Sequence, residues 1–182
     1  MKGLMFFAEG MEDSETLVTL SLLRKLNKEI TTASIEDTLW IRTLDGLKVE
    51  ADCFFKDVNV DDYDYLIIPG GKFCKPRIPL LNDVVKDTAK YFNDKGKLVA
   101  AICHAPTLLN DNGVLVGKEF VCHPSVKDLI TVGTYVGPKK AHTYQNVITA
   151  EAAGSPVEFT YEIVKYLDGK EVADALITRI RY

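Results

Sequence analysis

The sequence has no block of basic residues and no long hydrophobic run. Its 22 Lys and Arg and 26 Asp and Glu give a net charge of −4 that is spread along the chain, which argues against nucleic acid and membranes as partners. No apolar stretch approaches the roughly 20 residues that a membrane-spanning helix needs. The apolar run after Met1 ends at Glu9 and is shorter than the core of a secretory signal. We therefore expect a cytoplasmic protein.

The chain also lacks a recognisable cysteine pattern. Its four cysteines are irregularly spaced, and without a secretory signal we expect reduced thiols rather than disulfides. The pairs Cys103-His104 and Cys122-His123 are the alternative, a zinc site, but neither has the ligand spacing of a zinc finger or ribbon. We expect no metal and no cofactor.

No repeat, low-complexity tract or linker interrupts the sequence, so we expect a single domain over residues 1–182. Short apolar runs alternate with segments whose apolar residues recur at helical spacing, and this alternation predicts a doubly wound α/β sandwich. The expected strands cover residues 4–8, 29–35, 63–68, 98–102, 119–122, 134–136 and 146–150. The expected helices run from Asp13 or Ser14, as the capping residue, to 26, and over 82–93 and 156–167, the last in the chain.

The dipeptide Asp45-Gly46 stands between the apolar runs 39–44 and 47–50. It is a strong hairpin signal because both central residues of the tightest hairpin turns need positive φ. We therefore expect a small β-hairpin beside the main sheet.

One stretch stands out, Leu98-Val-Ala-Ala-Ile-Cys103-His104-Ala105-Pro106-Thr107. An aliphatic run stops at a cysteine, and Pro106 can open a helix, so the pattern predicts strand, sharp turn and helix. Ala101 and Ala105 are small, as the doubled-back chain of a nucleophile elbow requires. The N–H groups at a helix start favour the thiolate, which predicts a reactive Cys103. The alternative is a buried cysteine that behaves as a small hydrophobic residue.

Other polar or glycine pairs follow expected strands, and in a parallel sheet they can converge on one crevice. A cysteine nucleophile needs an acid or base nearby and two N–H donors for an oxyanion. The candidates for these roles are Glu12 and Glu15, Gly70 and Gly71, Cys103 and His104, and Cys122 and His123.

Gly71 and His104 are the expected backbone N–H donors, with Gly70 allowing close approach, while His123 could exchange protons and a glutamate could hydrogen-bond the sulfur. For the two glutamates and for His123, a structural role is the alternative. Glu12 and Glu15 also suit a helix N-terminus, and a histidine before proline is often a loop residue with a structural hydrogen bond.

The combination of motifs resembles the ThiJ/PfpI superfamily of class I glutamine-amidotransferase-like proteins, which includes the Parkinson-associated deglycase. The resemblance runs over essentially the whole chain, in family order. The segments that carry it are Gly10-Met-Glu-Asp-Ser-Glu15-Thr16, Ile67-Ile-Pro-Gly-Gly71, Ala100-Ala-Ile-Cys103-His104-Ala-Pro106, Cys122-His123-Pro124 and Gly169-Lys-Glu-Val172.

This resemblance implies a flavodoxin-like, mostly parallel sandwich that forms a homodimer. It also implies that Cys103 is the reactive cysteine, Glu15 the glutamate bonded to its sulfur, Gly71 and His104 the backbone donors, and His123 the nearby histidine. The remaining thiols Cys53 and Cys74 are expected to be structural.

Two segments depart from the family pattern. In the protease-like PfpI branch, a glutamate from a neighbouring subunit completes the site, whereas Gly70-Gly-Lys-Phe-Cys-Lys75 has no acid. This weakens the interpretation as a peptidase. In the deglycase-like branch, the segment after the late strand is often rich in Gly and Pro. Here it is Glu151-Ala-Ala-Gly154-Ser155, which predicts a different selection of molecules at the pocket mouth.

Three functions remain open from the sequence. The first is an enzyme in which the Cys103 thiolate adds to a small reactive carbonyl, or to the adduct that such a carbonyl forms on protein side chains. The second is a non-enzymatic sensor of oxidative stress, or a chaperone, in which Cys103 is oxidised. A PfpI-type peptidase or amidase is the third. The protonation state of Glu15 stays open, because a helix start favours its ionised form and a nearby thiolate its protonated form.

Overall fold

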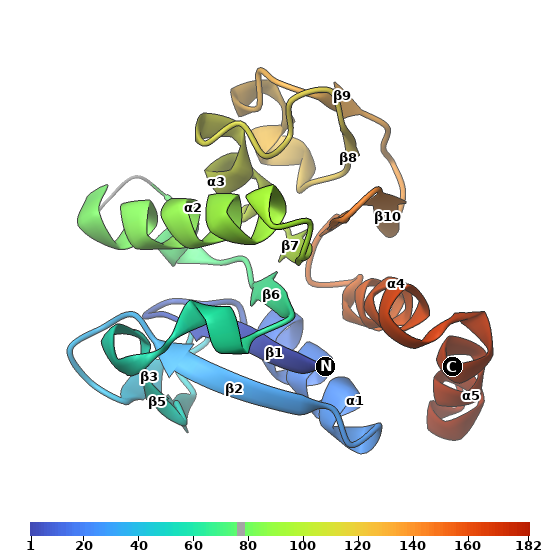
Figure 1. The fold of residues 1–182 in the computed structure, drawn as a ribbon, viewed down its shortest axis with the longest axis horizontal. Helices are drawn as coiled ribbons and strands as arrows, with labels where there is room; N and C mark the ends of the chain where they lie inside the picture. The colour runs from blue at the N-terminus through green and yellow to red at the C-terminus, as the bar shows by residue number, and fades with distance from the viewer. Residues whose placement is uncertain (76–78) are drawn as a thin grey trace.

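The computed structural model describes residues 1–75 and 79–182, and its centre is a seven-stranded sheet (Figure 1). All neighbouring strands are parallel except β10 and β11, which pair antiparallel at one edge. In sheet order the strands are β10 (Ala141–Tyr144), β11 (Val147–Ala150), β7 (Leu98–Ile102), β6 (Tyr65–Ile68), β1 (Lys2–Phe7), β2 (Glu29–Ser34) and β5 (Cys53–Phe54).

Helices pack on both faces of this sheet and bury an apolar cluster on each. The helices α2 (Pro79–Asp94) and α3 (Pro106–Asp111) cover one face, and α1 (Thr19–Lys25), α4 (Pro156–Asp168) and α5 (Lys170–Ile180) cover the other. Figure 1 shows α2 and α1 on opposite sides of the row of strands. This doubly wound arrangement confirms the predicted fold class. No described helix is both long and apolar enough to cross a membrane.

Two small pairs of strands lie outside the main sheet. The predicted hairpin is present as β3 (Trp40–Arg42) and β4 (Lys48–Glu50), which are antiparallel. Its turn differs from the prediction, since only Gly46 has positive φ, at 92°. The N–H of Thr43 donates to Leu47 O (2.9 Å) and that of Gly46 to Thr43 O (3.2 Å), so a three-residue loop replaces the two-residue turn. The second pair is parallel, β8 (Glu119–Phe120) with β9 (Thr134–Tyr135).

The chain has elements that the sequence pattern did not predict. The helix over 156–167 was expected to be the last, but α5 follows it after the single residue Gly169, whose φ of 92° ends one helix and begins the next. Strand β10 was also missed, because its four residues are all half-buried and show no alternation of apolar and polar side chains. The two-residue β5 is too short to give a pattern.

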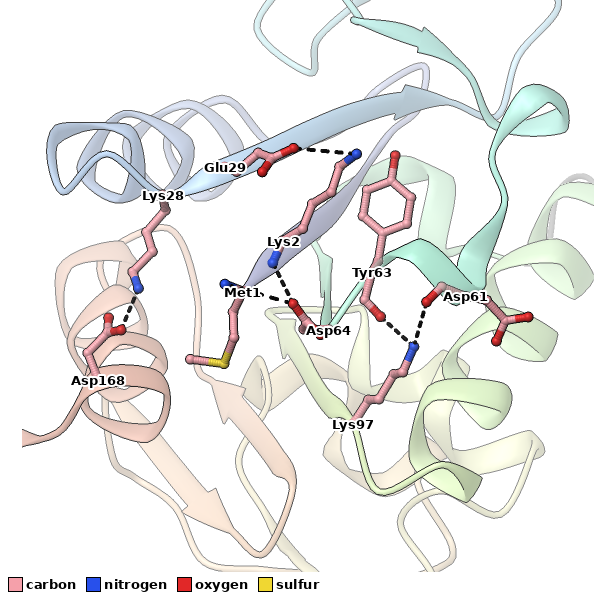
Figure 2. A network of polar contacts seen from close by, with 9 residues as sticks. All are labelled: Met1, Lys2, Lys28, Glu29, Asp61, Tyr63, Asp64, Lys97 and Asp168. Carbon is pink, nitrogen blue, oxygen red and sulfur yellow. Dashed lines mark hydrogen bonds and ion pairs between the residues drawn. The ribbon is translucent and has the colours of Figure 1, made fainter.

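The amino ends of the parallel strands are tied together by polar contacts (Figure 2). The Lys2 N–H donates to the Asp64 carboxylate over 2.7 Å. The Lys97 ammonium donates to the carbonyl oxygens of Tyr63 and Asp61 over 2.5 and 3.3 Å. These bonds satisfy backbone groups that the strands leave free at this end of the sheet. The carboxyl ends of the parallel strands lie at the opposite end of the sheet, where the predicted site residues are found.

Candidate active site

The candidate nucleophile Cys103 lies in the sharp turn between β7 and α3. Its φ of 65° is in the left-handed region, which is uncommon for a residue with a side chain. The Cys103 N–H donates to Ala150 O and its carbonyl accepts from the His123 N–H, both over 2.9 Å. The flanking Ala101 and Ala105 are fully buried. The turn therefore holds the cysteine by its backbone and leaves the sulfur just below the surface, with 6% of the residue exposed.

Glu15 is the buried acid of the site. It lies on a π-helical turn, Ser14–Val18, that precedes α1, and none of its surface is exposed. Its Oε2 accepts from the Gly70 N–H over 3.0 Å. Its Oε1 has no hydrogen-bond partner among the described residues.

The turn that carries Glu15 begins differently from the prediction. The Asp13 side chain makes no cap; it accepts from the Thr43 hydroxyl and, over 2.9 Å, from the Asp45 N–H in the hairpin loop. The Glu12 carboxylate accepts from the Glu15 N–H over 2.7 Å instead. Glu12 thus orients the turn, and Asp13 ties it to the hairpin.

Both glycines of the predicted pair are required by close contacts. A Cβ on Gly70 would lie 2.3 Å from Glu15 Oε2 and 2.6 Å from Cys103 Cβ. Gly71 has a φ of 121°, and a Cβ there would lie 2.4 Å from Gly10 O. The absent side chains let the acid and the cysteine approach each other.

The N–H groups of the two predicted oxyanion donors are not used in backbone pairing among the described residues. Neither the Gly71 N–H nor the His104 N–H donates to a backbone carbonyl within the described part of the chain. The His104 N–H faces the Cys103 sulfur and lowers the pKa of that thiol. Both groups are thus available to stabilise negative charge that develops near the sulfur.

Burial shifts both titratable groups toward their neutral forms. Burial, with the charge of Glu12 adding to it, raises the pKa of Glu15 from 4.5 to about 7. Burial and then the Glu15 carboxyl raise the pKa of Cys103 above its usual range. Two adjacent negative charges in a dry site are unfavourable, so the pair keeps at least one proton at neutral pH.

This result differs from the sequence-based expectation that helix N–H groups make Cys103 a thiolate. The helix α3 starts only at Pro106 and has six residues, and burial opposes its effect. Where the sequence left the protonation of Glu15 open, burial raises its pKa to about 7, so that both the protonated and the ionised forms are populated at neutral pH.

The His104 side chain, whose direction the sequence did not reveal, points back to the sulfur. Its Nδ1 lies 3.1 Å from Cys103 Sγ. Its ring stacks on that of His123, with centroids 5.0 Å apart and planes 14° from parallel. Burial, with His123 and Lys75 nearby, lowers the pKa of His104. A neutral imidazole therefore faces the thiol and can accept its proton.

Ser125 is a site residue that sequence reasoning missed. Its Oγ lies 2.7 Å from His123 Nδ1 and 3.4 Å from His104 Nε2, so it bridges the two histidines. The only signal in the sequence was its position two residues after His123, where a backbone N–H can meet the histidine side chain.

Two cavities meet at His104. One of about 400 Å³ is lined by Glu15, Cys103, His104 and His123, together with residues of the hairpin loop and Ala152-Ala153. The other, of about 510 Å³, is lined by His104, Ser125 and Lys75 among others. Cys103 and Glu15 thus border a cavity large enough for a small molecule, and Ala152 and Ala153 of the segment 151–155 line the same cavity.

The other cysteines do not share this arrangement. All four are free thiols. Cys74 is buried and its Sγ lies 3.7 Å from Pro69 O, and burial raises the pKa of Cys122 to about 12. Among the described residues, no group of three His, Cys, Asp or Glu is placed to hold a metal ion.

A buried acid against a cysteine, in the turn after the central strand of a parallel sheet, defines a class of α/β proteins with a candidate cysteine nucleophile. The model of the DJ-1/PfpI family matches residues 1–166, and the chain belongs to that family.

Relatives of known name agree with this assignment. Deglycase PYRAB04690 of Pyrococcus abyssi is 31% identical over 168 residues, 92% of this chain and 99% of that protein. Glutathione-independent glyoxalase DJR-1.2 of Caenorhabditis elegans is 31% identical over 172 residues, 93% of this chain and 89% of that protein. Protein DJ-1 homolog B of Arabidopsis thaliana is 30% identical, and the chain spans 39% of its length. The structure of oxidized Toxoplasma gondii DJ-1 matches with a TM-score of 0.88 at 28% identity, covering 100% of this chain and 98% of that one.

Proposed function

We propose that the protein is an enzyme that converts small reactive carbonyls, such as α-oxoaldehydes or their adducts on protein amines, to hydroxy acids through Cys103. The observation that carries the proposal is the double contact at one sulfur: a neutral imidazole nitrogen 3.1 Å away and a buried carboxyl whose pKa is raised to about 7. The names of the two relatives above, a glyoxalase and a deglycase, support the same class of chemistry.

The first step is addition of the sulfur to the aldehyde carbon of the substrate. The thiol proton passes to His104 Nδ1 as the S–C bond forms, and the carbonyl oxygen takes up a proton to give a hemithioacetal. Burial raises the pKa of the Cys103 thiol, so little thiolate is present before the substrate binds. The reaction therefore depends on a base that removes the thiol proton during attack. The N–H groups of Gly71 and His104 stabilise the developing oxyanion.

The second step moves a hydrogen between the two carbons. Glu15 removes the proton from the carbon bonded to sulfur and returns it to the neighbouring carbon, which converts the hemithioacetal to a thioester. Its pKa of about 7 suits a group that must both accept and donate, and His123 is the alternative for this role. Water then hydrolyses the thioester and restores the thiol, so methylglyoxal plus water gives lactate with no external oxidant or reductant.

The test is formation of lactate from methylglyoxal without glutathione. We expect Cys103→Ala to abolish turnover, because no other group forms the covalent intermediate. Cys53→Ala is the matched control, since Cys53 lies at the sheet edge on β5 and its loss is expected to leave turnover unchanged. Turnover by a folded Cys103→Ala variant would overturn the proposal.

A second candidate function is sensing of oxidants through Cys103. Glu15 Oε1, which has no hydrogen-bond partner among the described residues, and the His104 N–H that faces the sulfur could hold the oxygens of a sulfinate, and a relative has been solved in an oxidized state. Mass spectrometry after mild peroxide is then expected to find two added oxygens on Cys103 before any other cysteine. Even oxidation of all four thiols would contradict this role.

Assembly and location belong to the same proposal. We propose a cytoplasmic homodimer, and the exposed side chains Trp40 and Leu47 on and beside the hairpin, 60% and 52% exposed, are the apolar surface that supports pairing. Light scattering of the purified chain tests it, and a monomeric mass at micromolar concentration would exclude it. A peptidase role has no comparable support, because the segment 70–75 supplies no acid to the site.

A further inference from the structure

We propose that Ser125 is a positioning residue that fixes which nitrogen of His104 carries the proton, and so makes the Nδ1 of that histidine the acceptor for the Cys103 thiol. The inference deepens the proposed function, in which His104 takes the thiol proton. The inference follows from three linked hydrogen bonds, in which the donor of one bond determines which group must donate in the next.

The chain begins at a group whose proton cannot move. The backbone N–H of Ser125 donates to His123 Nδ1 over 3.2 Å. A backbone N–H can only donate, so His123 Nδ1 carries no proton and accepts.

The second link is the Ser125 hydroxyl. Its oxygen lies 2.7 Å from the same His123 Nδ1. Since that nitrogen has no proton to give, the hydroxyl must donate to it, and the lone pairs of Oγ stay free to accept.

The third link determines the tautomer of His104. Its Nε2 lies 3.4 Å from Ser125 Oγ, whose only proton is already used, so Nε2 must be the donor. A neutral imidazole has one N–H, and burial keeps His104 neutral. Its Nδ1 therefore presents a lone pair to Cys103 Sγ at 3.1 Å. The opposite tautomer would point an N–H at the thiol and could not remove its proton.

Stacking supports the same arrangement. The rings of His104 and His123 are nearly parallel, and this stacking fixes the plane of the His104 ring. Ser125 contacts the His104 ring at Nε2, the nitrogen that faces away from the sulfur. In many enzymes with a nucleophile and a base, a third group orients the base, and Ser125 takes that role here. The segment 70–75 provides no acid that could do so.

The experiment measures the tautomer directly and needs no substrate. The ¹⁵N chemical shifts of the imidazole nitrogens show which one is protonated, and in the wild type we expect His104 to carry its proton on Nε2. In Ser125→Ala the backbone N–H still fixes His123, but His104 loses its acceptor, and we expect a mixture of both tautomers. Ser125→Thr keeps a hydroxyl and is expected to restore the wild-type spectrum.

A second readout is the rate at which iodoacetamide alkylates Cys103 at neutral pH. We expect this rate to fall about fivefold in Ser125→Ala, the size of the effect of one ordinary hydrogen bond, and to recover in Ser125→Thr. A proton on Nδ1 in the wild type, or an unchanged tautomer and rate in Ser125→Ala, would overturn the inference. Absence of lactate formation would instead contradict only the proposed function, because neither readout involves turnover.

Discussion

At the scale of single residues, Glu15 couples the stability of the protein to pH. Its pKa is raised from 4.5 to about 7 on folding, so between these values the folded state binds more protons than the unfolded state. The resulting stabilisation is fully present below pH 4.5 and is lost as the pH rises through 7. At 1.36 kcal/mol per pKa unit, it amounts to roughly 3 kcal/mol.

Substitution of this residue is therefore expected to flatten the pH dependence of stability. In Glu15→Gln the side chain cannot ionise, so the free energy of unfolding should fall less between pH 5 and pH 8 than in the wild type. Urea denaturation at a series of pH values measures it. Glu171→Gln, at an exposed position of α5, removes the same charge and serves as the control. Equal slopes for wild type and Glu15→Gln would show that burial does not shift this carboxyl.

The sequence indicated most residues of the candidate site, but not the contacts between their side chains. Motif order and strand ends indicated Glu15, Gly70, Cys103 and His123, because small residues and turns leave a pattern along the chain. The direction of the His104 ring and the bridging role of Ser125 depend on how the loop after β8 packs against the turn, and no periodicity encodes that packing.

At the scale of elements, the hairpin β3–β4 and the π-helical turn are joined through Asp13. Its carboxylate accepts from the Thr43 hydroxyl and the Asp45 N–H, and Asp45 lines the smaller cavity. A short side chain on one element thus holds the loop of another over the candidate site.

Removal of this contact is expected to loosen the loop. In Asp13→Ala the Asp45 N–H loses its acceptor and the Thr43 hydroxyl keeps only its longer bond to Leu47 O, which should lower the free energy of unfolding by about 1–2 kcal/mol and speed hydrogen exchange in residues 43–47. Asp37→Ala, an exposed aspartate before the hairpin, is the control and should change neither. Unchanged exchange in Asp13→Ala would mean that the strands hold the loop without help.

The sequence predicted most long elements and fewer of the short ones. Strong apolar runs gave β1, β6 and β7, whose burial is complete or nearly so. The hairpin was expected, but not its loop, because Asp-Gly fits both a two-residue turn and the three-residue loop that formed. The short edge strands β5 and β10 depend on pairing with neighbours that are distant in sequence, and local propensity does not report such pairing.

At the scale of the whole molecule, the amino ends and the carboxyl ends of the parallel strands carry different groups of residues. Polar contacts such as that of Lys97 tie the amino edge together (Figure 2), while the candidate site occupies the carboxyl edge. In an open α/β sheet the carboxyl edge is where ligands bind. The polar contacts of Lys97 and the candidate site therefore lie at opposite ends of the strands.

This separation predicts that the amino edge can be weakened without effect on the cysteine. In Lys97→Met the carbonyl of Tyr63 loses its donor, and we expect the free energy of unfolding to fall by about 1–2 kcal/mol while the alkylation rate of Cys103 stays the same. Lys139→Met, at an exposed position, controls for loss of charge. A change in the alkylation rate at unchanged folding would reveal coupling between the edges.

The left-handed backbone of Cys103 sets stability against chemistry at a single position. A residue with a side chain loses roughly 1 kcal/mol there relative to glycine, while the buried Cys103 side chain packs in the apolar cluster on the α1 and α4 face of the sheet. The strained backbone therefore falls on the one residue whose sulfur the proposed chemistry requires.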